Sequence, residues 1–194
     1  WRHLQIRRSK KTNETMLIIS VNTDFFGDDY KTENAFRESL KLFISKLNAT
    51  SIYLLRNTGK ADIVQGEYEL ISGNPTITEQ LFHLDFEISP RSFFQTNTHG
   101  AEVLYKATQD MIKTVNPVLF DLYAGTGTIG MVLAKQSKEV YSVEIVPQAS
   151  EDNIRNLKKN NITNVHVINA PVEKFVEQWK NGEYAPLRKG GRGA

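Results

Sequence analysis

The sequence of 194 residues contains no cysteine. This absence excludes disulfides, thiolate metal ligands and a cysteine nucleophile among these residues. No apolar run approaches the roughly 20 residues that a membrane-spanning helix needs, and the first residues lack the apolar centre of a signal peptide. Because 40% of the residues are hydrophobic, the chain can still bury a core. We therefore expect a globular protein of one or two domains, located in the cytoplasm.

Positive and negative charges nearly balance, so the formal net charge is only +2. Basic residues nevertheless gather near the start of the chain, at Arg2, Arg7, Arg8, Lys10 and Lys11. Such a cluster can attract an anionic partner such as RNA. It can equally be the solvated edge of a β-hairpin that charge protects from unwanted pairing. The residues alone leave both interpretations open.

Residues 1–87 have the pattern of a small α+β domain with antiparallel strands. Two strand-like runs, Leu4–Arg8 and Met16–Val21, flank a polar connector and predict a hairpin. Apolar residues recur at three- and four-residue spacing from Thr32 to Leu47, which predicts a helix capped by Thr32. Further strands are expected over residues 51–56, 61–70 and 76–88, with a turn over residues 57–60.

A polar and aromatic segment, Ser89–Asn97, precedes a second predicted helix that Asn97 or Thr98 can cap. The apolar spacing of that helix predicts a buried stripe of Leu104, Ala107, Met111 and Val115. Two functions are open for the adjacent Phe93 and Phe94. They can anchor the linker between two domains, or one of them can line a ligand pocket with Gln95. The residues alone favour anchoring.

From residue 118 onward, strand and helix patterns alternate. Strands are predicted over residues 118–123, 139–143 and 164–168, and helices over residues 128–135, 147–160 and 172–179. This alternation is typical of parallel βαβ units. Residues 88–194 are therefore predicted to form the N-terminal part of a Rossmann-like α/β domain, which is incomplete because residues 182–194 show no further strand.

The first of these strands leads into the glycine-rich turn Gly125–Gly130. Such a turn lets the backbone approach a nucleotide-like ligand, and Glu144 ends the next strand, where an acid can bind the ribose of an adenosine. A dinucleotide and S-adenosylmethionine both fit this pattern. Asp121 would repel a pyrophosphate and attract a cationic amino-acid group, which favours S-adenosylmethionine. A turn whose glycines serve only tight packing is the remaining alternative.

The sequence resembles the S-adenosylmethionine-dependent RNA uracil-5-methyltransferases, the family that makes 5-methyluridine in transfer and ribosomal RNA. The resembling segments are Arg2–Ser9 with Glu14–Leu17, Ile88–Asn97, Asp121–Gly130, Ser142–Val146 and Asn156–Asn164. They follow in the family's order and span nearly the whole chain.

This resemblance implies an enzyme that uses S-adenosylmethionine as cofactor and RNA as partner. Some members of the family also hold an iron-sulfur cluster through cysteines; because this chain has no cysteine, we expect no metal in it. Its short apolar runs lead us to expect no membrane partner. It implies that residues 1–87 are a central domain that helps to hold RNA and that residues 88–194 begin the methyltransferase domain. The expected cofactor-binding residues are Gln95, Tyr123, Gly125, Gly127, Thr128, Glu144 and Pro171. The expected RNA-binding residues are Arg7, Arg8 and Phe93.

The absence of cysteine is the main departure from the family pattern. In the family, a cysteine thiolate adds to carbon 6 of uracil, carbon 5 takes the methyl group, and a base then removes the carbon 5 proton before the thiol leaves. We therefore assign no catalytic residue and expect a fragment that lacks the catalytic region. The alternative is a non-catalytic module that binds S-adenosylmethionine or RNA.

Overall fold

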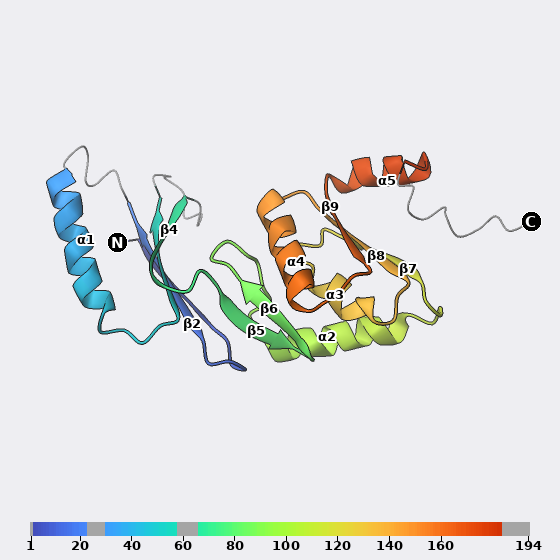
Figure 1. Cartoon of the computed structure of the whole chain (residues 1–194), viewed down its shortest axis with the longest axis horizontal. Helices are drawn as coiled ribbons and strands as arrows, with labels where there is room; N and C mark the ends of the chain where they lie inside the picture. Colours follow the sequence, from blue (N-terminus) through green and yellow to red (C-terminus); the bar gives the residue numbers. More distant parts are fainter. Residues whose placement is uncertain (1, 23–29, 58–65, 184–194) are drawn as a thin grey trace, which may run out of the picture. The chain divides into compact units, whose positions relative to one another are not determined.

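The computed structural model describes residues 2–22, 30–57 and 66–183 (Figure 1). The chain divides into two compact units, residues 1–90 and residues 91–194. Across the described ranges, no helix combines the length and the apolar character needed to cross a membrane. The assignment of residues 1–87 to RNA and of residues 88–194 to the methyltransferase domain stays a prediction.

Unit 1 is built on a mixed sheet of four strands in the order β1–β2–β3–β4. The strands are β1 (His3–Arg8), β2 (Thr15–Val21), β3 (Ser51–Arg56) and β4 (Glu67–Gly73). Strands β1 and β2 form the predicted hairpin. Strands β2 and β3 run parallel, because helix α1 (Tyr30–Ile44) crosses over between them. The predicted antiparallel arrangement is confirmed for β1–β2 and β3–β4 and is wrong for β2–β3.

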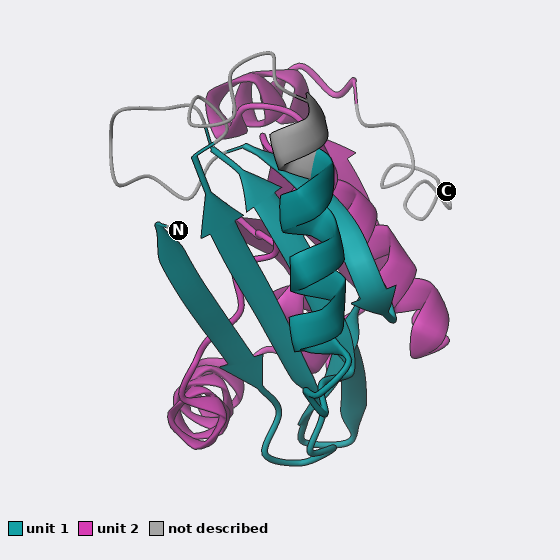
Figure 2. Ribbon diagram, turned by 90° about the vertical axis from the view of Figure 1, so that its left-hand side faces the viewer, with its two compact units in different colours: residues 1–90 teal, residues 91–194 magenta. Residues whose placement is uncertain are grey.

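Helix α1 lies along one face of this sheet (Figure 2). Its buried Leu40 and Ile44 belong to one cluster with Ile19 and Ile52 of the sheet, as the apolar spacing predicts. The helix begins at Tyr30, ahead of Thr32, so the predicted N-cap is wrong.

A second hairpin in unit 1 consists of β5 (Ile77–Leu81) and β6 (Leu84–Ile88). The turn between them contains Phe82 at a positive φ of 54°, which divides the predicted 76–88 strand into two. Residues 58–60 of the predicted turn and residues 61–65 of the predicted strand lie outside the described residues.

The described part of unit 2, residues 91–183, contains three parallel strands in the order β7–β8–β9, as the alternating pattern predicts. The strands are β7 (Val118–Leu122), β8 (Glu139–Glu144) and β9 (Val165–Asn169). Each strand is followed by one helix, namely α3 (Thr128–Ala134), α4 (Pro147–Lys159) and α5 (Val172–Lys180). The arrangement is Rossmann-like.

Successive side chains of these strands point to opposite faces of the sheet. Leu119 and Val140 face helix α3, where both line one cavity with Leu133. Tyr141 on the other face forms a buried cluster with Phe175 of α5. Figure 1 accordingly shows α5 on the side of the sheet opposite α3.

Helix α2 (Thr98–Met111) begins at the predicted cap, where Asn97 Oδ1 accepts the backbone N–H of Gly100 at 2.9 Å. The predicted buried stripe is wrong, because the buried residues of α2 are Ala101 and Tyr105. The predicted residues Leu104, Ala107, Met111 and Val115 are all exposed, Val115 to 86%. The helix turns this other face inward because Tyr105 and Gln109 find hydrogen-bond partners on α3, at Thr128 and Val132.

Candidate cofactor-binding site

The glycine-rich turn joins β7 to α3 and needs an unusual backbone. Tyr123, Gly125 and Gly127 have positive φ angles of 59°, 56° and 78°. Glycine adopts this conformation without strain, whereas a bulky residue such as Tyr123 does not. A Cβ atom on Gly127 would also lie 2.2 Å from the side chain of Asn153, whereas one on Gly125 would meet nothing within 4 Å. Gly127 is therefore required for packing, and the space beside Gly125 is open.

Glu144 at the end of β8 holds the turn in place. One carboxylate oxygen accepts the N–H of Gly125 and the other accepts the N–H of Val146, each at 2.8 Å. Only 8% of Glu144 is exposed. Each carboxylate oxygen can accept a second hydrogen bond, so the group can fix the backbone and still meet a ligand hydroxyl.

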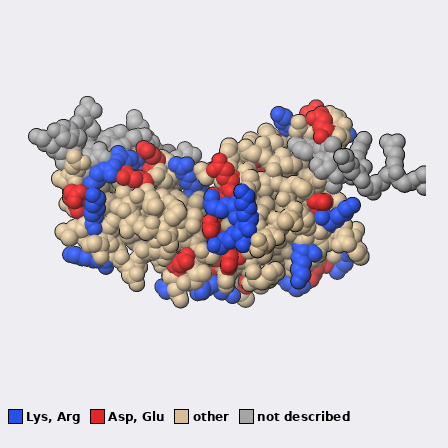
Figure 3. Space-filling view, viewed as in Figure 1, with Lys and Arg blue, Asp and Glu red and all other residues tan. Residues whose placement is uncertain are grey.

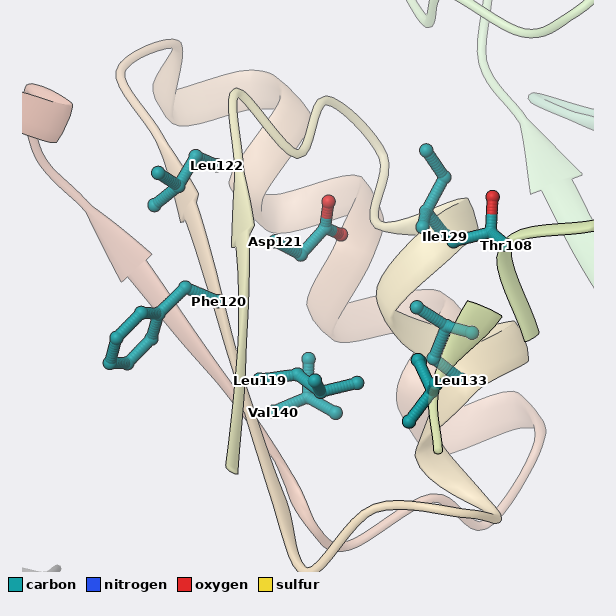
Figure 4. A pocket seen from close by; sticks show the side chains of 9 residues that line it. Thr108, Leu119, Phe120, Asp121, Leu122, Ile129, Leu133 and Val140 are labelled. Carbon is teal, nitrogen blue, oxygen red and sulfur yellow. The ribbon is translucent and has the colours of Figure 1, made fainter. Parts of the chain in front are cut away.

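Asp121 points into the fold, toward α3, as Figure 4 shows. Its Oδ2 atom accepts the N–H of Gly130 at 2.9 Å and the hydroxyl of Ser142 at 3.4 Å. Burial raises the pKa of Asp121 to about 6, although these two hydrogen bonds act in the opposite direction. The structure does not support the prediction that the charge of Asp121 selects a cationic ligand, because the carboxylate is buried and bonded to α3 and β8.

A cavity of about 470 Å³ lies beside Asp121 (Figure 4). It is lined by Thr108, Ile112, Leu119, Phe120, Asp121, Leu122, Ile129, Leu133 and Val140. None of the predicted cofactor-binding residues belongs to this lining. The cavity is therefore separate from the site that the glycine-rich turn defines.

The segment before α2 is fastened to the glycine-rich turn. The carbonyl oxygen of Phe93 lies 3.5 Å from the hydroxyl of Thr126, which donates to it. The side chain of Phe93 is 74% exposed, Phe94 is half-buried and Gln95 is exposed. The expectation that both phenylalanines anchor the linker is therefore wrong for Phe93. The buried residues of this segment are Pro90 and Ser92.

The other predicted cofactor-binding residues border the same end of the sheet. Tyr123 directly follows β7 and is 72% exposed. Thr128 opens α3, and its hydroxyl lies 3.3 Å from that of Tyr105. Pro171 follows β9 and is the N-cap of α5. Tyr123 and Pro171 thus follow the carboxyl ends of parallel strands, where ligands of open α/β sheets bind.

Two residues that hold this site in shape are absent from the sequence-based prediction. Asn169, the last residue of β9, donates its side-chain N–H groups to the carbonyls of Glu144 at 2.9 Å and Ile145 at 3.1 Å. Asp152 of α4 accepts a hydrogen bond from Ser92. Asn169 could have been predicted in the same way as Glu144, because each is the last residue of a parallel strand. No local sequence pattern indicates a role for Asp152.

The residues predicted to bind RNA in unit 1 differ in exposure. The Arg7 guanidinium donates to the carbonyl oxygen of Ser89 at 3.0 Å, and burial lowers the pKa of Arg7. Arg8 is exposed and lies 3.4 Å from Asn13 Oδ1. Arg8 is therefore presented at the surface, whereas Arg7 holds the backbone. Phe93, the third predicted RNA contact, belongs to unit 2.

The fold is that of a Rossmann-like domain, and its glycine-rich turn has the geometry that is typical of sites for nucleotide-type ligands. The model of the tRNA (uracil-5-)-methyltransferase family matches residues 28–188. The chain belongs to this family. Within the described ranges, no group of three or more His, Asp or Glu side chains could hold a metal ion.

Individual relatives agree with this assignment. An uncharacterised RNA methyltransferase of Fusobacterium nucleatum is 37% identical over 94% of this chain and 40% of its own length. One of Clostridium tetani is 35% identical over 92% of this chain and 39% of its own length. The crystal structure of Pyrococcus abyssi tRNA (uracil-54, C5)-methyltransferase in complex with S-adenosyl-L-homocysteine is similar with a TM-score of 0.67, at 28% identity over 85% of this chain and 38% of that chain. The chain spans about 40% of the length of these relatives.

Proposed function

We propose that this chain is the cofactor-binding and RNA-holding part of a methyltransferase that transfers a methyl group from S-adenosylmethionine to carbon 5 of a uridine in tRNA or rRNA. The hydrogen bond from the Gly125 N–H to the Glu144 carboxylate carries this proposal. It joins a glycine-rich turn and an acid at the carboxyl end of a parallel sheet, which is the usual position of an adenosine ligand in such folds. The complex of the Pyrococcus abyssi protein with S-adenosyl-L-homocysteine supports the choice of ligand.

The shape of the turn fits this cofactor. The space beside Gly125 is open, and the half-satisfied carboxylate of Glu144 adjoins it. We assign cofactor binding to Gln95, Tyr123, Gly125, Gly127, Thr128, Glu144 and Pro171. Glu144 would accept hydrogen bonds from the ribose hydroxyls, and the exposed ring of Tyr123 would cover an apolar part of the ligand. When bound, the sulfonium group supplies an electrophilic methyl group.

The loop between β1 and β2, residues 9–14, is held by side-chain hydrogen bonds and would present basic residues to RNA. Ser9 donates its hydroxyl to Glu79 at 2.9 Å, and both side chains are buried. Thr12 donates its hydroxyl to the carbonyl oxygen of Thr78 at 2.7 Å. These bonds fasten the loop to β5, so that its backbone is already ordered before RNA binds.

Arg8, Lys10 and Lys11 would meet RNA phosphates through this loop, while Arg7 would orient the backbone at Ser89. On the face that Figure 3 shows, basic and acidic side chains are interspersed, and no wide surface of one charge appears there. The exposed ring of Phe93 would stack on a base, as aromatic side chains do with unpaired nucleotides.

The chain contains no cysteine, so it does not itself supply the thiolate that adds to uracil. We expect this chain alone to bind cofactor and RNA without methylating them. The same observation favours a second candidate function, a non-catalytic binding module. A methylation assay with the longest gene product that contains this chain separates the two, because only the enzyme produces 5-methyluridine.

Calorimetry on this chain tests the cofactor assignment directly. S-adenosyl-L-homocysteine and NAD would be titrated under identical conditions. We expect S-adenosyl-L-homocysteine to bind more tightly. Tighter binding of NAD would contradict the proposal.

A further inference from the structure

We propose that Ser92 and Asp152 form a positioning pair that holds residues 93–95 over the glycine-rich turn and so sets the affinity of the cofactor site. The inference rests on the proposed function and adds two residues that touch no ligand themselves. Helix α4 has an unusually polar buried side. The buried residues of α4 are Ser150, Asp152, Asn153, Asn156 and Leu157.

Asp152 is the charged member of this group, and its side chain is only 1% exposed. A buried carboxylate is strongly destabilising unless it is paired and hydrogen-bonded. Both oxygens have partners. Oδ1 lies 2.5 Å from Nη2 of Arg155, one turn further along α4, and Oδ2 accepts the hydroxyl of Ser92. The arginine thus neutralises the carboxylate, which in turn fixes a residue 60 positions earlier in the chain.

Ser92 and Phe93 are fastened to two different elements. Ser92 is 4% exposed and bonded to α4, whereas the carbonyl oxygen of Phe93 accepts the hydroxyl of Thr126 in the glycine-rich turn. Two attachments at adjacent residues fix both the position and the direction of the segment. The exposed side chains of Phe93 and Gln95 are therefore presented from a backbone that is held beside the turn.

The hydrogen bond between Ser92 and Asp152 can be removed by substitutions that change only one or two atoms. Ser92→Ala removes the hydroxyl that donates to Oδ2 of Asp152. Ser92→Thr keeps the hydroxyl. Asp152→Asn replaces one acceptor by an N–H₂ group, which would face either the Ser92 hydroxyl or the Arg155 guanidinium, and both of these donate to it now.

The test measures amide hydrogen exchange of unliganded protein and affinity for S-adenosyl-L-homocysteine, at a temperature well below unfolding. A hydrogen bond to a charged group contributes about 1.5–3 kcal/mol, or roughly a tenfold to hundredfold change in an equilibrium. We expect Ser92→Ala and Asp152→Asn to speed exchange over residues 93–97 about tenfold and to weaken affinity about tenfold. Ser92→Thr should behave like the parent.

The matched control is Ser137→Ala, because Ser137 is also a buried serine of unit 2 and donates to the carbonyl oxygen of Leu133 at 2.8 Å. Its loss should lower thermal stability without changing exchange over residues 93–97 or affinity. Unchanged exchange in Ser92→Ala would overturn the positioning role. Faster exchange with parental affinity would overturn the link to the cofactor site.

The two readouts keep this inference separate from the proposed function. Failure of the parent chain to bind S-adenosyl-L-homocysteine would contradict the proposed function and, with it, the part of the inference that concerns affinity. The exchange measurement needs no ligand, so it still decides whether Ser92 and Asp152 position the segment.

Discussion

The carboxylate of Glu144 and the backbone N–H of Gly125 are joined by a 2.8 Å hydrogen bond that links the end of β8 to the turn after β7. The other oxygen of Glu144 holds the N–H of Val146. One buried side chain thus fixes both loops that border the proposed adenosine position. Changes at Glu144 should therefore affect ligand binding through the shape of the turn as well as through direct contact.

Glu144→Gln tests this dual role. The substituted amide can accept only one of the two backbone N–H groups, because its N–H₂ group meets the other one as a donor. We expect affinity for S-adenosyl-L-homocysteine, measured by calorimetry, to fall about tenfold to hundredfold. Glu139→Gln on the same strand, where Glu139 pairs with His166, is the control and should keep parental affinity. Parental affinity of Glu144→Gln would remove the residue from the site.

Two alanine substitutions in the glycine-rich turn, at Gly125 and Gly127, should separate the energetic cost of a strained backbone from the cost of a steric clash. Gly125→Ala adds a Cβ in open space at positive φ, and this strain should lower the free energy of unfolding by about 1 kcal/mol. Gly127→Ala adds the same strain and a 2.2 Å approach to Asn153, so we expect a loss of about 3 kcal/mol. Urea unfolding measures both. Equal losses would show that the approach to Asn153 is relieved without cost.

Asn153 offers an opposite test, because both polar atoms of its buried side chain lack a hydrogen-bond partner among the described residues. A buried unsatisfied polar group costs about 1–3 kcal/mol. Asn153→Ala should therefore leave the free energy of unfolding unchanged or raise it. Asn156→Ala on the same helix is the comparison, and we expect it to destabilise, since Asn156 is buried and has partners. A marked loss for Asn153→Ala would reveal a partner for the amide.

The raised pKa of Asp121 predicts how stability depends on pH. Its folded value of about 6 exceeds the ordinary value of 3.8, so the folded protein binds more protons than the unfolded chain between these two values. The contribution of Asp121 therefore favours folding at low pH and is lost as pH rises from about 4 to 6.

Asp121→Asn isolates this contribution, since the amide oxygen can still accept the N–H of Gly130. The free energy of unfolding of the variant relative to the parent should increase by about 2–3 kcal/mol between pH 4 and pH 7. Thermal unfolding across that range measures the difference. A difference that stays constant from pH 4 to pH 7 would contradict the raised pKa.

Substitution of Arg7 and Arg8 in turn should show which of them contacts RNA and which stabilises unit 1. Arg8→Gln should weaken tRNA binding and reduce the slope of log affinity against log salt by about one. Arg7→Gln should mainly lower the stability of unit 1, because Arg7 holds the carbonyl oxygen of Ser89. Filter binding at several salt concentrations, together with thermal unfolding, measures both effects. A larger change of the salt slope for Arg7→Gln would reverse the two assignments.

The sequence predicts most of unit 2 because its signals are local. Alternation of apolar strands and amphipathic helices is sufficient to predict three parallel strands. The position of Glu144 beside the turn follows from the rule that parallel strands end at one edge. The family resemblance is confirmed by the family model that matches residues 28–188.

Features that depend on distant partners were not predictable in this way. Helix α2 does not bury its apolar stripe, because Tyr105 and Gln109 on another face form hydrogen bonds with α3. The inward direction of Asp121 depends on its register opposite Ser142. The contact of Ser92 with Asp152 joins residues far apart in sequence. The apolar periodicity within one helix or strand cannot predict contacts between side chains of different elements.

The polar inner side of α4 has a thermodynamic consequence. Four of its five buried residues are Ser150, Asp152, Asn153 and Asn156, so its attachment to the domain removes little hydrocarbon from water. Detachment of this helix should therefore contribute little to the heat capacity change of unfolding, which arises mainly from apolar surface.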